Sequence, residues 1–457
     1  MLNVTGWCGV PRNLRMRATE LCFHPRMRSF LLVALVGVTC ATAACSGSDE
    51  SLGPGTDGGS AMADGGGPGT DGDSSVADGA SPPDSRFAAD TFLPWWGGPS
   101  YYAKWSHGFS SDPNWFPITV WLQSPDNAAL FQGAGIEFLM GLYDGPTNAQ
   151  LSTLAKASFR AVADQGGEYA SHLADPTLMG WLQPDEPDNA QALSGGGYGP
   201  CIPPSELQQT YKTFNQQDGT RPVVLGLGRG VADVSWVGRG SCTGKTEMYA
   251  EYAKAADVLA YDIYPVNEGV PLEIVATGVD NLRKWSGYTK PVIMDVEASN
   301  FNDTTMPTTA QTKSEVWMAL VHGATGIDYF CHQFQPTFIE NACVSTPALR
   351  TALAGINAQV KGLAPVLNTP SVGNGVAVIS SNPDIPVDVM LKRFNGATYL
   401  LTTEMRNGTT TATYTLRDFP ATATAEVLGE ARSIPVGHGV FGDSYSQYGV
   451  HLYRITY

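Results

Sequence analysis

Two acidic stretches of the chain contain residues that could do chemistry together. The first, GWLQPDEPDN (180–189), places three carboxylates among prolines, with Glu186 at its centre. The second, KPVIMDVEA (290–298), has Asp295 and Glu297 two residues apart at the end of an apolar run. Two carboxyl groups can hydrolyse a glycosidic bond, because one protonates the leaving oxygen while the other attacks the anomeric carbon or activates water. Such a reaction requires a fold that brings Glu186 and Glu297 to one site.

A regular alternation along the chain indicates which fold this is. Eight short apolar runs alternate with helix-like segments, and they lie at 116–123, 136–143, 159–165, 178–184, 221–228, 258–265, 290–298 and 326–334. Strand and helix repeated eight times over roughly 250 residues are what a closed parallel barrel requires. The predicted fold class is therefore α/β, a (β/α)8 TIM barrel, and a doubly wound sheet is the alternative.

The connecting segments carry signals for helix starts. A hydroxyl side chain can cap the first free amides of a helix, and a Gln three residues later can reach back to the cap. Three pairs fit this pattern: Thr147 with Gln150, Ser205 with Gln208, and Thr308 with Gln311. Segments 246–256 and 271–287 also predict helices, whereas 166–177 is short and irregular.

The active site of such a barrel lies at the carboxyl ends of its strands. Glu186 follows the fourth predicted strand and Glu297 ends the seventh, so we expect both side chains to converge over the mouth from facing walls. Two simpler interpretations remain: Glu186 could cap a following helix, and Glu297 could be a buried salt-bridge partner. The second is less favourable, because Asp295 shares the inward face with Glu297 and two acids there need a functional or paired explanation.

With these acidic stretches on this barrel, the sequence resembles the clan A glycoside hydrolases over roughly residues 92–362. The resemblance implies that Glu186 in PDEP is the acid/base and Glu297 in IMDVEA the nucleophile of a retaining reaction. It also makes Tyr264 in YDIYP a candidate for hydrogen bonding the nucleophile, with a core tyrosine as the alternative. The clan usually has Asn before the acid/base Glu, and here that position is Asp185, which can still accept a hydrogen bond from a sugar hydroxyl.

Aromatic and polar residues gather at the predicted strand ends. Aromatic faces cover the apolar faces of sugar rings, while carboxylates and amides bind hydroxyl groups. The expected substrate-binding residues are Trp121, Tyr143, Gln165, Asp185, Asp262, Tyr264, Asp295 and His332. Each is individually also compatible with barrel packing, and Trp181 is expected in the core. The predicted partner is therefore a carbohydrate substrate.

Charge and missing motifs exclude several other functions. The formal net charge of −16 argues against nucleic acid, which requires dense Lys and Arg. The sequence has no CxxC or HExxH spacing for a metal, and GLGRG (226–230) does not open a phosphate-binding helix. It also lacks GxSxG, the signature of a serine nucleophile. We expect neither a metal nor a cofactor.

The first ninety residues predict export and a tether. Residues 1–45 combine a start extension with MRSFLLVALVGVTCATAAC, whose basic end, short apolar run and small residues indicate an export signal. This segment resembles a bacterial lipoprotein signal with Cys45 as the lipidated residue, although cleavage after Ala43 or Ala44 is an alternative. Residues 46–90 form a linker rich in Gly, Ser and Asp. The protein is thus expected at the outer membrane or cell surface as a lipoprotein, or secreted.

The remaining chain divides into a barrel over 91–365 and a C-terminal β-sandwich over 366–457, where strands alternate with turns. The sandwich is expected to cover the barrel, with independent sugar binding as the alternative. Four cysteines follow the linker, and export makes disulfides plausible. Of three possible pairings, proximity favours Cys201 with Cys242 and Cys331 with Cys343. The sequence does not indicate an oligomeric state.

Three functions are compatible with these residues. The first is an exported retaining glycoside hydrolase, and the second is a glycan-binding lipoprotein that keeps the barrel as a silent scaffold. A polysaccharide lyase is less favoured, because its active site would require a Tyr or His base beside an Arg or Lys. The feature that discriminates between the first two is the separation of the two carboxyl groups, which should be roughly 5 to 5.5 Å in a retaining enzyme and wider in an inverting one.

Overall fold

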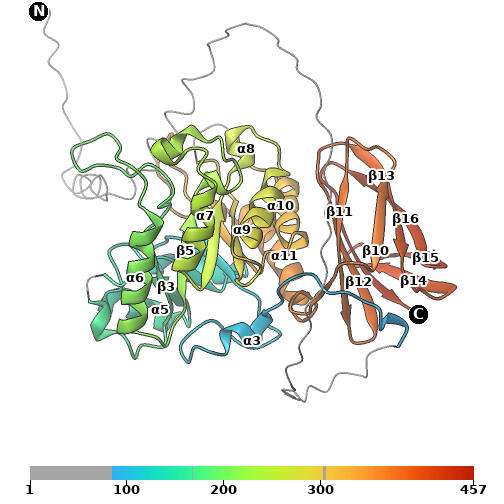
Figure 1. Cartoon of the computed structure of the whole chain (residues 1–457), viewed down its shortest axis with the longest axis horizontal. Helices are drawn as coiled ribbons and strands as arrows, with labels where there is room; N and C mark the ends of the chain where they lie inside the picture. The colour runs from blue at the N-terminus through green and yellow to red at the C-terminus, as the bar shows by residue number, and fades with distance from the viewer. Residues whose placement is uncertain (1–84, 167, 302–304) are drawn as a thin grey trace, which may run out of the picture.

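The computed structural model describes residues 85–457 except 167 and 302–304. The predictions for residues 1–84, including the lipidation of Cys45, concern residues outside this described range. Eight parallel strands form a closed barrel in chain order (Figure 1). They are β1 Ile118–Trp121, β2 Phe138–Met140, β3 Arg160–Ala163, β4 Leu178–Leu182, β5 Val223–Leu227, β6 Val258–Asp262, β7 Val292–Glu297 and β8 Gly326–Phe330. Because β8 pairs with β1, the predicted barrel is confirmed and the doubly wound sheet is excluded.

Helices connect the strands and cover the outside of the barrel. They are α4 Ala128–Gly133, α5 Asn148–Lys156, α6 Pro204–Gln217, α7 Glu247–Tyr252, α8 Pro265–Glu268, α9 Ile274–Trp285, α10 Thr309–Val321, α11 Pro347–Gly362 and α12 Ala364–Leu367, with the short α3 Gly98–Tyr102 before β1. The described residues between β3 and β4 contain only a 3-10 turn, Tyr169–Ser171, as the irregular segment predicted.

Two of the three predicted helix caps are confirmed, and the third is wrong. Thr147 and Thr308 each form a complete capping box with the Gln three residues later. The helix α6 instead begins at Pro204, so Ser205 lies inside its first turn and caps nothing. A proline fixes φ at a helical value and needs no hydrogen-bond acceptor for its nitrogen, which suits the first helical position.

The barrel has an apolar core on each side of its sheet. Val162, Val224 and Ile293 belong to the cluster inside the barrel, whereas Val292 belongs to the cluster beneath the helices. Trp181 also faces outward, is fully buried and donates its indole N–H to Asp218 at 2.9 Å, so its expected core role is confirmed. The strand period of two therefore fixes which side chains can reach the mouth.

The C-terminal domain is an antiparallel sheet folded into two layers. Its strands are β9 Ser371–Val372, β10 Val376–Ser380, β11 Val387–Phe394, β12 Ala397–Glu404, β13 Thr409–Leu416, β14 Thr422–Val427, β15 Arg432–Gly437, β16 Val440–Ser446 and β17 Val450–Thr456. The layer β10-β13-β16 meets the layer β15-β14-β17-β12-β11-β9 through a single residue pair, Gly437 with Val440. Side chains from both layers share one apolar core, which confirms the predicted β-sandwich.

The sandwich and the barrel are joined by a continuous apolar core. Met390, Leu401 and Leu452 of the sandwich belong to the same buried cluster as the helices of the barrel. The segment before the barrel also contacts the sandwich, because Asp90 forms ion pairs with Arg393 and Arg417.

Both favoured disulfides are present. Cys201 pairs with Cys242 at a Cα–Cα distance of 6.2 Å, and Cys331 pairs with Cys343 at 4.9 Å. The first joins the loops after β4 and β5, and the second closes the loop after β8. Among the described residues, none of the helices is long and apolar enough to cross a membrane.

Candidate active site

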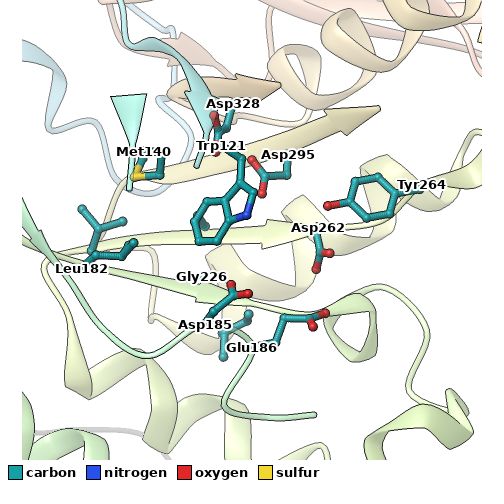
Figure 2. Close-up of a pocket in the computed structure, with 13 residues that line it drawn as sticks. Trp121, Met140, Leu182, Asp185, Glu186, Gly226, Asp262, Tyr264, Asp295 and Asp328 are labelled. Atoms are coloured by element: carbon teal, nitrogen blue, oxygen red, sulfur yellow. The ribbon is translucent and has the colours of Figure 1, made fainter. Parts of the chain in front are cut away.

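A narrow pocket lies at the carboxyl ends of the barrel strands (Figure 2). Five carboxylic acids line it: Asp185, Glu186, Asp262, Asp295 and Asp328. Apolar and aromatic side chains complete the wall, among them Trp121, Met140, Leu182 and Tyr264. The free space between them is about 10 Å³, which is roughly the room that one water molecule needs.

Three of the acids form a row across neighbouring strands. Asp262 of β6 stands opposite Asp295 of β7, which in turn stands opposite Asp328 of β8. Parallel strands in this register place their side chains at one level of the barrel, and all three residues are more than nine-tenths buried. Asp328 was not among the residues expected from the sequence, although an acid inside the buried run GIDYF was the available signal.

The loop after β4 brings the other two acids to the pocket. Glu186 has a backbone φ of 39°, an unusual conformation for a residue with a side chain. Its carbonyl oxygen accepts hydrogen bonds from the backbone N–H of Asn189 at 3.0 Å and from the side chain of Gln191 at 2.9 Å. The loop is therefore held in this turn by its own residues.

The third carboxylate of PDEPDN anchors the loop instead of facing the pocket. Asp188 is fully buried and accepts hydrogen bonds from the backbone N–H of Gly228 and from the hydroxyl of Tyr249, both at 2.8 Å. Gly228 also makes room for Glu186, because a Cβ at this position would lie 2.5 Å from Oε1 of Glu186. The loops after β4 and β5 thus position Glu186 together.

Burial and mutual repulsion raise the pKa values of the pocket acids. Burial raises the pKa of Glu186 well above its usual range, and the charges of Asp262 and Asp185 add to this effect. The pKa of Asp262 is likewise raised by burial and by Asp295, and burial raises the pKa of Asp328 to about 7. Several of these carboxyl groups are therefore protonated near neutral pH, as a general acid must be.

The structure does not bring Glu297 to this pocket. Its side chain is fully buried and turns toward the start of α8, where the backbone N–H groups of Val266 and Asn267 donate to its carboxylate. The side chain of Asn267 adds a further hydrogen bond at 2.5 Å. Glu297 is the last residue of β7, where the alternation of side chains ends, and these donors satisfy its oxygens away from the mouth.

A second buried acid accompanies Glu297. Glu315 of α10 is fully buried, and its carboxyl group hydrogen-bonds Glu297. Burial raises the pKa of Glu297 to about 7 and that of Glu315 well above its usual range. The two groups therefore share a proton near neutral pH.

The other expected binding residues divide into two groups. Trp121, Asp185, Asp262, Tyr264 and Asp295 line the pocket, and the hydroxyl of Tyr264 hydrogen-bonds Asp262. The remaining residues lie apart from the pocket lining. Tyr143 contacts Nε2 of His332 at 2.8 Å, and Gln165 donates to the backbone of Phe214 at 3.2 Å. Burial lowers the pKa of His332 to about 4, so its ring is neutral.

No three His, Cys, Asp or Glu side chains in the described part of the chain are placed to hold a metal ion. The arrangement suits proton transfer and the binding of polar groups by carboxylates.

Comparison with known proteins finds likeness only at the level of structure. No family model matches the sequence, and no curated protein matches it. A GH30 endoxylanase from Clostridium papyrosolvens is 13% identical, with a TM-score of 0.44 over 75% of this chain and 96% of that chain. The maltogenic α-amylase AmyB from Thermotoga neapolitana is 7% identical, with a TM-score of 0.46 over 76% and 99%. At these values the functional assignment rests on the site residues.

Proposed function

We propose that this protein is a glycoside hydrolase whose active site is the acidic pocket at the barrel mouth. The observation that carries the proposal is the meeting of Glu186, after β4, with Asp262, at the end of β6, in one pocket at the carboxyl ends of the strands (Figure 2). Hydrolysis of a glycosidic bond needs two such groups, one acidic and one ionised.

Glu186 is the general acid/base in this proposal. It is half-buried, so a substrate oxygen can reach it, and its raised pKa keeps it protonated before the reaction. It donates this proton to the leaving oxygen and later takes one from the attacking water. Asp185 beside it accepts hydrogen bonds from substrate hydroxyls.

The second carboxylate is assigned to Asp262. It lines the pocket with Glu186. Burial and the charge of Asp295 raise its pKa, and the hydroxyl of Tyr264 opposes this rise by hydrogen bonding. The nucleophile implied by the clan resemblance is Glu297, whose buried carboxylate is held by three donors outside the pocket lining. A retaining reaction at Asp262 forms a bond between its carboxylate oxygen and the anomeric carbon while the leaving oxygen takes the proton of Glu186. Water then cleaves that bond.

Export and anchoring belong to the proposal through the sequence of residues 1–90. Cys45 would carry the lipid, with the linker holding the barrel away from the membrane. Fractionation of cells should find the protein with membranes, and the Cys45→Ala variant should be released from them. Recovery of the unaltered protein in the soluble fraction would support secretion instead.

The test is a panel of polysaccharides and oligosaccharides incubated with the purified protein. We expect hydrolysis of at least one member, and NMR of the first-formed product should show a retained anomeric configuration. A product of inverted configuration would contradict the covalent intermediate at Asp262 but would still agree with a two-carboxylate site. Binding of a glycan without hydrolysis of any member would favour the silent scaffold.

A further inference from the structure

The mouth pocket holds more acids than a two-carboxylate reaction uses. Besides Glu186 and Asp262, it is lined by Asp185, Asp295 and Asp328. The described residues that line it include no Lys, Arg or His. Asp262, Asp295 and Asp328 are buried, and with no cation in the described pocket lining their charges must be neutralised by protons or by a bound cation, because an uncompensated buried charge is costly.

Asp295 and Asp328 are partners of each other, whereas the hydrogen-bond partner of Asp262 is the hydroxyl of Tyr264. Asp295 and Asp328 hydrogen-bond each other, which requires a proton between them. Asp262 is 7% exposed, and its Oδ1 has no hydrogen-bond partner among the described residues. Figure 2 shows its carboxyl group directed toward the side of the pocket where Glu186 lies. This buried oxygen can therefore accept a hydrogen bond from a ligand that enters the pocket.

The size of the pocket restricts the donor. Its free space of about 10 Å³ is roughly that of one water molecule, so a single ammonium group fits, whereas a sugar ring must stay above it. A metal ion is disfavoured, since no group of three potential ligand side chains in the described ranges has a suitable arrangement. An ammonium group needs only separate acceptors, and the pocket supplies several.

We propose that the substrate is an amino sugar chain, and that the ammonium group of a hexosamine unit enters the pocket and donates to Oδ1 of Asp262. This inference rests on the proposed function and names its substrate class. An N-acetyl group at the same position would lack the positive charge of the ammonium group and would be larger than the free space of the pocket. The formal net charge of −16 would also attract a cationic polymer to the protein over a distance.

The experiment measures binding by calorimetry and hydrolysis in parallel. The probes are oligosaccharides of glucosamine and of galactosamine, their fully N-acetylated counterparts, and glucose and galactose oligosaccharides of equal length. We expect the amine form to bind the unaltered protein about tenfold or more tightly than the N-acetylated form, as a charge-assisted hydrogen bond predicts. D262N should abolish this preference, while D384N, which removes an exposed acid in the sandwich, should keep it.

Each outcome bears on one of the two proposals. Equal or tighter binding of N-acetylated or neutral sugars overturns the amino sugar assignment, even if those sugars are hydrolysed and the proposed function stands. Preferential binding of the amine form without hydrolysis of any probe overturns the proposed function and makes the amino sugar a ligand of the pocket and not its substrate. Tri-lysine binding with the same dependence on Asp262 overturns the assignment to a sugar. If D262N does not fold, the preference of the unaltered protein must still disappear above the pKa of the substrate amine.

Discussion

The backbone of Glu186 has a strained conformation. A non-glycine residue with φ near 39° costs on the order of 1–3 kcal/mol. The hydrogen bonds from Asn189 and Gln191 to its carbonyl offset part of this cost. The turn directs the side chain into the pocket, where burial raises its pKa.

Replacing Glu186 should separate the two steps of hydrolysis. A general acid matters most when the leaving group is poor, so Glu186→Ala should slow the hydrolysis of natural glycosides by about 10²- to 10⁴-fold. The first step on aryl glycosides should be spared, because an activated aryl group departs without a proton. Added azide should restore turnover by replacing the water that Glu186 activates. Both are measured by steady-state and burst kinetics.

A helix-capping role for Glu186 makes a different forecast. The variant would then lose about 1 kcal/mol of stability, with all substrates affected alike and no rescue by azide. Uniform loss of this kind would contradict the acid/base assignment.

Gly228 offers a second test of the position of Glu186. The backbone of Gly228 has φ −84°, which Ala adopts without strain, but the added Cβ would lie 2.5 Å from Oε1 of Glu186. Gly228→Ala should therefore lower kcat about tenfold or more by displacing this carboxyl group. The matched control is Gly226→Ala, whose Cβ meets nothing closer than Asp185 at 3.8 Å. Equal effects of both variants would show that Glu186 is not the sensitive group.

Two amide substitutions decide between Asp262 and Glu297. We expect Asp262→Asn to abolish turnover, since an amide cannot act as the nucleophile. Glu297→Gln should keep measurable activity and lower stability, because one of its oxygens becomes a donor facing the N–H groups at α8. Activity and thermal midpoint are measured on both. Loss of turnover in a well-folded Glu297→Gln, with activity kept in Asp262→Asn, would reverse the assignment.

The regular elements were predictable from sequence, whereas the direction of single side chains at their ends was not. All eight strands and the capping boxes at Thr147 and Thr308 follow from local patterns that tertiary packing supports. The alternation of side chains along β7 correctly predicted that Asp295 points into the barrel. The same alternation failed for Glu297, because the backbone N–H groups of α8, which is distant in sequence, bind its carboxylate at the strand end. For Asp328 the acid inside GIDYF was a signal, but its place beside Asp295 follows only from the register between β7 and β8.

The loops after β4 and β5 are coupled through Asp188. Its carboxylate binds Gly228 and Tyr249, and the guanidinium of Arg239, also fully buried, lies 4.0 Å away. Asp188→Ala should destabilise the protein by about 3 kcal/mol, because it leaves a buried cation without its partner. Activity should fall as well, since Glu186 shares this loop. Urea unfolding and kinetics check both, and a change below about 0.5 kcal/mol would contradict the anchoring role.

The barrel and the sandwich are joined by polar contacts as well as by their common core. Arg406 of the sandwich forms an ion pair with Glu273 beside α9, and Asp90 ties the entering chain to Arg393 and Arg417. The exposed pair of Arg406 with Glu273 contributes little to the free energy of unfolding. A contact at the same interface, centred on the partly buried His322, depends on pH.

His322 bridges the two domains only in its charged form. Nδ1 lies 2.9 Å from Asp280 of α9 and Nε2 lies 3.0 Å from Asp388 of β11, so both nitrogens must donate. These partners raise the pKa of His322 from 6.5 to about 9 despite its burial. Because the folded pKa is the higher one, the stabilisation is fully present below pH 6.5 and is lost as pH rises through about 9.

The shift corresponds to at most about 3 kcal/mol, and it predicts a measurable pH dependence of unfolding. The unaltered protein should lose stability between pH 6.5 and 9 relative to His322→Gln, whose amide does not titrate. Urea unfolding midpoints of both proteins are measured at pH 6 and pH 9.5. At each pH the difference in midpoint between the two proteins reports His322 alone, because all other titrating groups are common to both. This difference in midpoint should be largest at pH 6 and close to zero at pH 9.5, because the neutral imidazole can donate to only one of the two aspartates. A difference that stays constant over this range would mean that His322 joins the domains by packing alone.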